Sequence, residues 1–215
     1  MKSKRLFYLN KISNLLLESR GDKMKIEDIA AAIGVTKKTI YNYFDSKQDL
    51  CECIVDSYIR GQLNQIRVGM KGEAPLVTLL SINERVYKAY GHCRLLLLPL
   101  GGVHQSESFV KLVEEYQQDL IEITDFTIRK GINEYLFDAD INTTLVSKFY
   151  ISGIQVLSNP SSLKNQMAEL RVQHKETLFY LLKGICTPKG IAELRQMLDI
   201  KVRLRDGERR EVSVA

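Results

Sequence analysis

The sequence is poor in the residues that build metal cages, disulfide frameworks and broken helices. Its 215 residues include no tryptophan, three histidines, four prolines and four cysteines. Few prolines leave room for long helices, because proline breaks a helix interior. Cys51, Cys53, Cys93 and Cys186 form no CxxC pair and match no zinc or disulfide spacing. We therefore expect free thiols, no metal ion, and a reduced, cytoplasmic location.

Long apolar runs and catalytic motifs are also missing. The longest apolar run, "LLLLPL", is about a third of a membrane span. The start "MKSKRLFYLNKISN" is too polar for a signal peptide. The sequence contains no Gly-rich phosphate loop, nucleophile elbow or HExxH, and its scattered histidines suggest no triad. We expect a soluble protein that is not an enzyme, with no catalytic or metal-binding residues and no contact with a membrane.

Positive charge is concentrated at the N-terminus. Residues 1–50 hold ten Lys and Arg against six Asp and Glu, whereas the other residues hold 21 against 20. A local basic excess suits a partner that carries phosphates, although an excess of four also arises by chance. The charge alone leaves nucleic-acid binding open.

Apolar residues recur at steps of three and four along almost the whole chain, which predicts an all-α protein. Helices are expected at about residues 4–19 and 26–33, followed by a short helix that begins at a cap at residue 36. Further helices are expected at about 46–70 and 75–90, with another short helix within 91–105. The remaining helices are expected at about 106–130, 140–157, 163–186 and 188–199. The expected N-caps are Thr36, Ser46, Asp140 and Thr187, and Gly131 is expected to end the helix that precedes it. For the tail, 201–215, we favour a solvated segment over a small hairpin.

Two short helices joined by "IGVT" form a helix-turn-helix. Their inner faces are expected to pack on the first helix through apolar side chains, which are Leu9, Ile12, Leu16, Ile29, Ala30, Ile33, Val35, Ile40 and Phe44. The outer face of the second short helix then carries Lys37, Lys38, Tyr41 and Asn42, since these residues pair at i and i+4. Lysine can donate to guanine and asparagine can pair with adenine, so this face suits a DNA groove.

Residues 26–50, "IEDIAAAIGVTKKTIYNYFDSKQDL", resemble the DNA-binding signature of the TetR (tetracycline repressor) family. The shared elements are the DIA of the first short helix, the Gly-Val turn, the Thr cap, and Thr-aliphatic-Tyr-x-x-Phe followed by Ser-Lys and a leucine. The specific similarity extends back to Leu9 and so covers about a quarter of the chain.

The resemblance implies an all-α fold in two domains. Residues 1–47 would form the helix-turn-helix domain, the helix 46–70 would link it to the body, and residues 48–200 would form a helical regulatory and dimerisation domain. The implied function is a bacterial, ligand-responsive transcriptional regulator. It would repress by binding a palindromic site on double-stranded DNA as a homodimer, and an unknown small-molecule effector would release it. The alternative is a helical DNA-binding or protein-interaction protein without an effector.

The resemblance also implies residue roles. The residues expected near bases are Thr36, Lys37, Lys38 and Asn42. Those expected on the phosphate backbone are Thr39, Tyr41, Tyr43 and Lys47. Three positions depart from the family pattern. Asp22 replaces an aromatic residue, whose space Met24 is expected to fill. Lys25 replaces a capping threonine and can reach a phosphate. Glu27 can accept from cytosine, but we favour a role at the helix N-terminus.

Two residue sets are predicted for the body. Aromatic and histidine side chains suggest a ligand pocket, lined by some of Tyr87, Tyr90, His104, Tyr116, Phe126, Phe149 and Tyr150. An apolar seam on two helices suggests a four-helix interface with a second copy, through Phe149, Gly153, Leu163, Met167, Leu170, His174, Leu178 and Leu181. At His174 a hydrogen-bonded interface histidine is favoured over a pH-sensitive group. His92, Cys93 and His104 match no known metal-site spacing.

Overall fold

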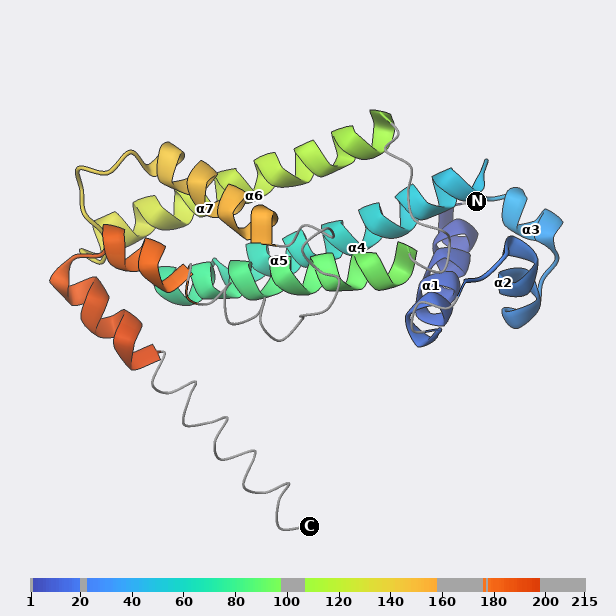
Figure 1. Cartoon of the computed structure of the whole chain (residues 1–215), viewed down its shortest axis with the longest axis horizontal. Helices are drawn as coiled ribbons and strands as arrows, with labels where there is room; N and C mark the ends of the chain where they lie inside the picture. Colours follow the sequence, from blue (N-terminus) through green and yellow to red (C-terminus); the bar gives the residue numbers. More distant parts are fainter. Residues whose placement is uncertain (1, 20–22, 98–106, 158–175, 177, 198–215) are drawn as a thin grey trace, which may run out of the picture. The chain divides into compact units, whose positions relative to one another are not determined.

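In the computed structural model the protein is all-α (Figure 1). The structure describes residues 2–19, 23–97, 107–157, 176 and 178–197. The helices are α1 (Lys2–Glu18), α2 (Ile26–Ala32), α3 (Lys37–Tyr41), α4 (Lys47–Gly69), α5 (Pro75–Leu97), α6 (Glu107–Asn133) and α7 (Thr143–Leu157). Residues 178–185 and 188–197 are also helical. Within the described ranges, no helix is both long and apolar enough to cross a membrane.

The chain forms two compact units. The first consists of Met1–Val68 and Glu84–Leu120, and the second of Gly69–Asn83 and Ile121–Ala215. Both α5 and α6 therefore contribute residues to each unit. The predicted domain boundary after residue 47 stays a prediction.

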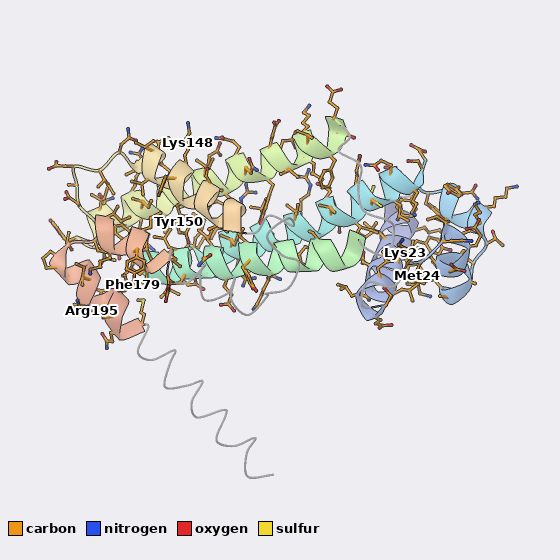
Figure 2. All side chains as sticks on the ribbon, in the orientation of Figure 1. Lys23, Met24, Lys148, Tyr150, Phe179 and Arg195 are labelled. Carbon is orange, nitrogen blue, oxygen red and sulfur yellow. The ribbon has the colours of Figure 1, made fainter. Side chains whose placement is uncertain are left out.

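A single apolar core joins α1, α2, α3 and the start of α4, and we call these four segments the N-terminal cluster. Leu9, Ile12 and Leu16 of α1 are buried against Ile40 and Phe44, as the apolar spacing predicts. Ile29 and Ala30 are buried with them, whereas Ile33 and Val35 are half-buried at the edge. The segment before α2 adds Met24, which packs on this core as expected (Figure 2).

The start of α4 also belongs to the N-terminal cluster. Leu50, Cys51 and Ile54 are buried in the same core. Ser46 caps α4, because its Oγ accepts a hydrogen bond of 3.0 Å from the backbone N–H of Asp49. The carboxylate of Asp49 accepts in turn from the N–H of Asp45 at 3.0 Å. The predicted cap is therefore confirmed, and its return bond reaches one residue further back than a standard capping box.

Three helix boundaries differ from the sequence prediction. α5 runs on through Leu97, so the separate short helix expected after Tyr90 is wrong. α6 passes Gly131 and ends at Asn133. The glycine is required by packing rather than by a helix end, since a Cβ there would overlap the ring of Phe137. α7 is capped by Asn142, not Asp140, because the Asn142 Oδ1 accepts from the N–H of Leu145 at 2.9 Å.

In the second unit, the segment after α6 is held by the start of the last helix. The N–H of Thr187 donates to the carbonyl of Leu136 at 3.0 Å, and an isolated antiparallel bridge joins Phe137 to Cys186. The Thr187 hydroxyl accepts from the N–H of Gly190 at 3.2 Å, which confirms the predicted cap. The remainder of the helix expected at 163–186, up to residue 175, and the tail lie outside the described residues.

Candidate nucleic-acid interface

The turn between α2 and α3 is closed by backbone hydrogen bonds that require a left-handed residue. The N–H of Val35 donates to the carbonyl of Ala30 at 2.9 Å, and that of Gly34 donates to Ala31 at 3.1 Å. This is a Schellman motif, and Gly34 takes φ 75°. Glycine tolerates this conformation at little cost, so the sequence places it where the chain must reverse.

α3 begins at a well-formed N-cap. The Oγ1 of Thr36 accepts from the backbone N–H of Thr39 at 3.1 Å, and the two hydroxyls lie 2.9 Å apart. Ile40 and Phe44 anchor the inner face of this segment in the core. The cap and the two anchors together fix which side of α3 faces outward.

The outward side of α3 carries the residues expected near DNA. Lys37, Lys38, Tyr41 and Asn42 are exposed, and they lie one helical turn apart in two pairs. α3 itself ends at Tyr41, and Asn42 follows in helical conformation as its C-cap. The structure therefore brings these four residues to one surface, as the sequence predicts. Thr36 is also exposed at the start of this surface.

Three residues expected on the phosphate backbone, Thr39, Tyr43 and Lys47, are less exposed. All three are half-buried. The Tyr43 ring lies 5.0 Å, centroid to centroid, from the ring of Tyr8 on α1. Such a contact holds the Tyr43 ring in place while leaving a phenol that can donate to an anion. The sequence analysis missed Tyr8, whose only signal was an aromatic residue on the half-buried side of α1.

An ion pair joins α2 to α3 on this surface. The Nζ of Lys37 lies 2.6 Å from the Oε1 of Glu27, and it also lies 5.8 Å from the centroid of the Tyr41 ring. The hydrogen bond from Lys37 lowers the pKa of Glu27, and the same bond raises the pKa of Lys37. Sequence reasoning assigned Glu27 to the helix N-terminus and did not foresee its pairing with Lys37.

The N-terminus of α2 is held by its other acidic residue. The Asp28 Oδ2 accepts from the backbone N–H of Lys25 at 2.9 Å. The Lys25 side chain is exposed, and its contact with a phosphate stays a prediction. The helix end lacks the usual threonine cap, and Asp28 supplies the carboxylate instead.

Comparison with known proteins identifies the family. The model of the bacterial regulatory proteins of the tetR family matches residues 16–54. YvaF of Bacillus subtilis, an uncharacterized HTH-type transcriptional regulator, is 37% identical over 161 residues, which cover 70% of this chain and 80% of YvaF. This chain belongs to the TetR family. It is a DNA-binding transcriptional regulator and not an enzyme.

Solved structures of transcriptional regulators share the fold. A TetR transcription regulator from Haloarcula marismortui superposes with a TM-score of 0.70 at 16% identity, covering 86% of this chain and all of that one. SmeT in complex with triclosan superposes with a TM-score of 0.63 at 10% identity, covering 86% and 93%. SmeT represses the multidrug efflux pump SmeDEF of Stenotrophomonas maltophilia.

The residues expected to line a ligand pocket lie in different surroundings. Tyr116 and Tyr150 are buried, and Tyr87 is half-buried. Tyr150 lies on α7 (Figure 2), and its hydroxyl donates to the carbonyl of Leu79 at 2.8 Å. Phe126 and Phe149 are exposed, which places them on the surface of the second unit rather than in an enclosed pocket. The side chain of Tyr90 and all of His104 lie outside the described residues, and the pocket assignment stays a prediction.

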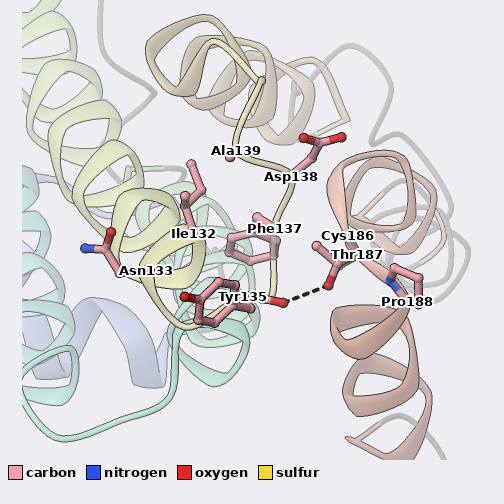
Figure 3. A pocket seen from close by; sticks show the side chains of 9 residues that line it. All are labelled: Ile132, Asn133, Tyr135, Phe137, Asp138, Ala139, Cys186, Thr187 and Pro188. Carbon is pink, nitrogen blue, oxygen red and sulfur yellow. Dashed lines mark hydrogen bonds between the residues drawn. The ribbon is translucent and has the colours of Figure 1, made fainter.

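A groove of about 630 Å³ lies beside the C-terminal end of α6 (Figure 3). It is lined by Ile132, Asn133, Tyr135, Phe137, Asp138, Ala139, Cys186, Thr187 and Pro188. Two of these residues are joined by a hydrogen bond, because the Thr187 hydroxyl donates to the carbonyl of Tyr135 at 2.8 Å. None of the side chains expected to line a ligand pocket borders this groove.

The residues expected at a dimer interface are only partly described. Phe149 is exposed and Gly153 is half-buried on α7. Leu178 is buried within the chain, and Leu181 is half-buried. The others, Leu163, Met167, Leu170 and His174, lie outside the described residues. Near Phe149, sequence reasoning missed Leu145, which is also exposed and lies one turn earlier on α7.

Proposed function

We propose that the protein is a repressor that binds a palindromic DNA site as a homodimer and is released by a small-molecule effector. One observation carries the proposal. The capped, core-anchored α3 presents Lys37, Lys38, Tyr41 and Asn42 together on its exposed side. A short helix fixed in this way can enter the major groove with its N-terminal residues at the base edges.

The donors on α3 favour sequence reading over backbone contact alone. Asn42 can form two hydrogen bonds to adenine, and Lys38 can donate to guanine O6 and N7. Lys47 and Tyr43, nearer the core, suit phosphates that set the position of the helix. This division of roles is the one that the sequence analysis expects.

Homodimer formation is supported by exposed apolar side chains on α7. Leu145 is 64% exposed and Phe149 is 69% exposed, and the two lie four residues apart on one face. Gly153 continues that face one turn later, where a small residue allows another helix to approach. Large apolar side chains gathered on one surface usually mark a contact with a partner. We assign this face to the second copy of the chain.

The proposed effector is a small molecule bound in the helical body. The chain is similar in fold to SmeT, which has been solved in complex with triclosan. In this chain, the aromatic residues Tyr116 and Tyr150 are buried in separate units. A small, largely apolar molecule with a polar group would suit an aromatic-lined helical body.

Selection of bound fragments from random DNA by the purified full-length protein tests the proposal. The expected site is an inverted repeat whose half-sites lie about 34 Å apart, which is one helical turn. The same selection with Asn42→Ala should lose the preference at one base of each half-site. The Lys71→Ala variant, which changes an exposed lysine of the second unit, should recover the same site. Recovery of unrelated fragments with only salt-dependent affinity would favour the alternative of a sequence-tolerant DNA-binding protein.

A further inference from the structure

We propose that Glu27 determines how strongly the protein distinguishes its own site from other DNA, by holding Lys37 until a suitable acceptor replaces the carboxylate. The inference rests on the proposed role of α3 in DNA binding. It gives Glu27, an acidic residue on a basic surface, a role in selectivity in addition to its place in the first turn of α2.

The geometry assigns separate tasks to the two acidic residues in the first turn of α2. Asp28 is occupied at the helix start, where it accepts from the N–H of Lys25. Glu27 instead reaches across the turn to Lys37, the first residue of α3, at 2.6 Å. The side chains of Glu27 and Lys37 remain 54% and 52% exposed, so the pair lies on the surface that DNA would approach.

The pair is placed so that DNA must compete with it. The Lys37 Nζ contacts the Glu27 carboxylate and lies over the ring of Tyr41, and both contacts favour its ammonium in this position. Any base or phosphate that accepts a hydrogen bond from Lys37 has to displace the Glu27 carboxylate. Exposed ion pairs are weak, so this exchange is possible, but its gain depends on what replaces Glu27.

The exchange distinguishes two kinds of acceptor. A single phosphate offers Lys37 a charge much like the one that it leaves, and the freed Glu27 carboxylate then faces the phosphate backbone at close range. A guanine edge offers two acceptors in a fixed geometry, which a correctly placed lysine can use. The net effect of Glu27 is therefore to lower the affinity for arbitrary DNA more than the affinity for the selected site.

The test uses full-length protein, the selected duplex and an unrelated duplex of equal length, each measured over a salt series. Glu27→Gln keeps the size of the side chain and removes its charge. It should bind the unrelated duplex about 5- to 10-fold more tightly and make the slope of log K against log salt steeper by about one per subunit, since Lys37 then neutralises a phosphate. The affinity for the selected site should rise less, so the ratio of the two affinities should fall.

Two further variants isolate the pair. Glu18 is an exposed acidic residue at the end of α1, and Glu18→Gln changes the net charge by the same amount as Glu27→Gln. This variant should alter neither the slope of log K against log salt nor the ratio of the affinities for the two duplexes. In a Lys37→Gln background, Glu27→Gln should raise the affinity for the unrelated duplex less than about twofold. If Glu27→Gln raised the affinity for the unrelated duplex by the full factor of about 5- to 10-fold in that background, the proposal would be overturned. Repulsion between the Glu27 carboxylate and the phosphates would then explain the increase without Lys37. Loss of affinity for the selected site alone, on Glu27→Gln, would also overturn the proposal, because Glu27 itself would then read a base.

A heparin column provides a readout that needs no DNA site. Glu27→Gln should elute at higher salt than both the wild type and Glu18→Gln, whereas Lys37→Gln should elute at lower salt. Elution of Glu27→Gln together with Glu18→Gln would overturn the proposal. If the wild type bound neither duplex, the proposed function would fail, and the order of elution from heparin would still test the pairing of Glu27 with Lys37.

Discussion

Arg5 and Asp49 form an ion pair across 44 residues of sequence, and the Nη2 of Arg5 lies 3.2 Å from each carboxylate oxygen of Asp49. The same nitrogen lies 3.0 Å from the Sγ of Cys53. Asp49 also accepts from the N–H of Asp45. One carboxylate thus connects α1, the segment before α4, and α4 itself.

Asp49→Ala should destabilise the fold more than Arg5→Ala. Loss of the carboxylate removes both the ion pair and the acceptor for the Asp45 N–H, at a cost of about 1–2 kcal/mol. Arg5→Ala removes the half-exposed ion pair together with the contacts of the guanidinium with the Cys53 Sγ and the Phe44 ring, and should cost less than about 1 kcal/mol. Urea denaturation followed by circular dichroism measures both changes. An equal or larger loss for Arg5→Ala would contradict the prediction.

Asn42→Ala should weaken binding to the selected DNA site by about 1–3 kcal/mol and relax the choice of one base. The reason is the loss of a two-bond contact to adenine, which no phosphate contact replaces. Competition binding with single-base variants of the site measures the effect. A uniform loss over all variants would place Asn42 on the backbone instead.

Lys47→Ala should weaken binding to every DNA alike. Lys47 begins α4 and is half-buried, which suits a positioning contact to a phosphate. The slope of log K against log salt should become shallower by about one for each subunit. Titrations at several salt concentrations, on selected and unrelated duplexes, measure it. An effect confined to the selected site would contradict the assignment.

Phe149→Glu should convert the proposed dimer to monomers, because a carboxylate would replace a large apolar side chain in the contact. Lys148→Glu is the matched control, since Lys148 is exposed on the adjacent position of α7 and changes the charge in the same direction. Sedimentation of both variants at micromolar concentration gives the result. A monomeric wild type would exclude the interface altogether.

Two helix ends with the same backbone motif should respond in opposite ways. Gly34 lies two residues beyond the end of α2 and Tyr135 two residues beyond the end of α6, each in the left-handed region, with φ values of 75° and 61°. Gly34→Ala should cost about 1 kcal/mol from backbone strain alone, since a Cβ there meets no atom within 4 Å. Tyr135→Gly should raise stability by up to about 1 kcal/mol, because the Tyr135 side chain is 77% exposed. Melting temperatures test both.

The sequence predicts the N-terminal cluster well because every signal there is local. Gly34, Thr36 and Ser46 fix the turn and the caps through bonds within a few residues, and the spacing of apolar residues orients the helices. The sequence could not reveal the pairing of Glu27 with Lys37, which depends on the angle between two helices.

The body was harder to interpret because its determinants are distant contacts. In the sequence, Gly131 is typical of a residue that ends a helix. In the structure α6 continues past it, and the glycine is needed because the ring of Phe137 packs where a side chain would be. Asp140 and Asn142 are equally good caps by composition, and only the path of the chain selects Asn142. The same limit applies to Phe126 and Phe149, whose aromatic character suggested a pocket although both lie at the surface.

The burial of Leu50, Cys51 and Ile54 among the residues of α1, α2 and α3 limits how the regulator can be recombined. A chimera that joins this DNA-reading segment to the body of another regulator would have to retain the first two turns of α4. A junction placed immediately after Lys47 would leave apolar residues of one parent facing a helix of the other. Exchange of modules between such regulators is therefore expected to succeed within α4, beyond Ile54.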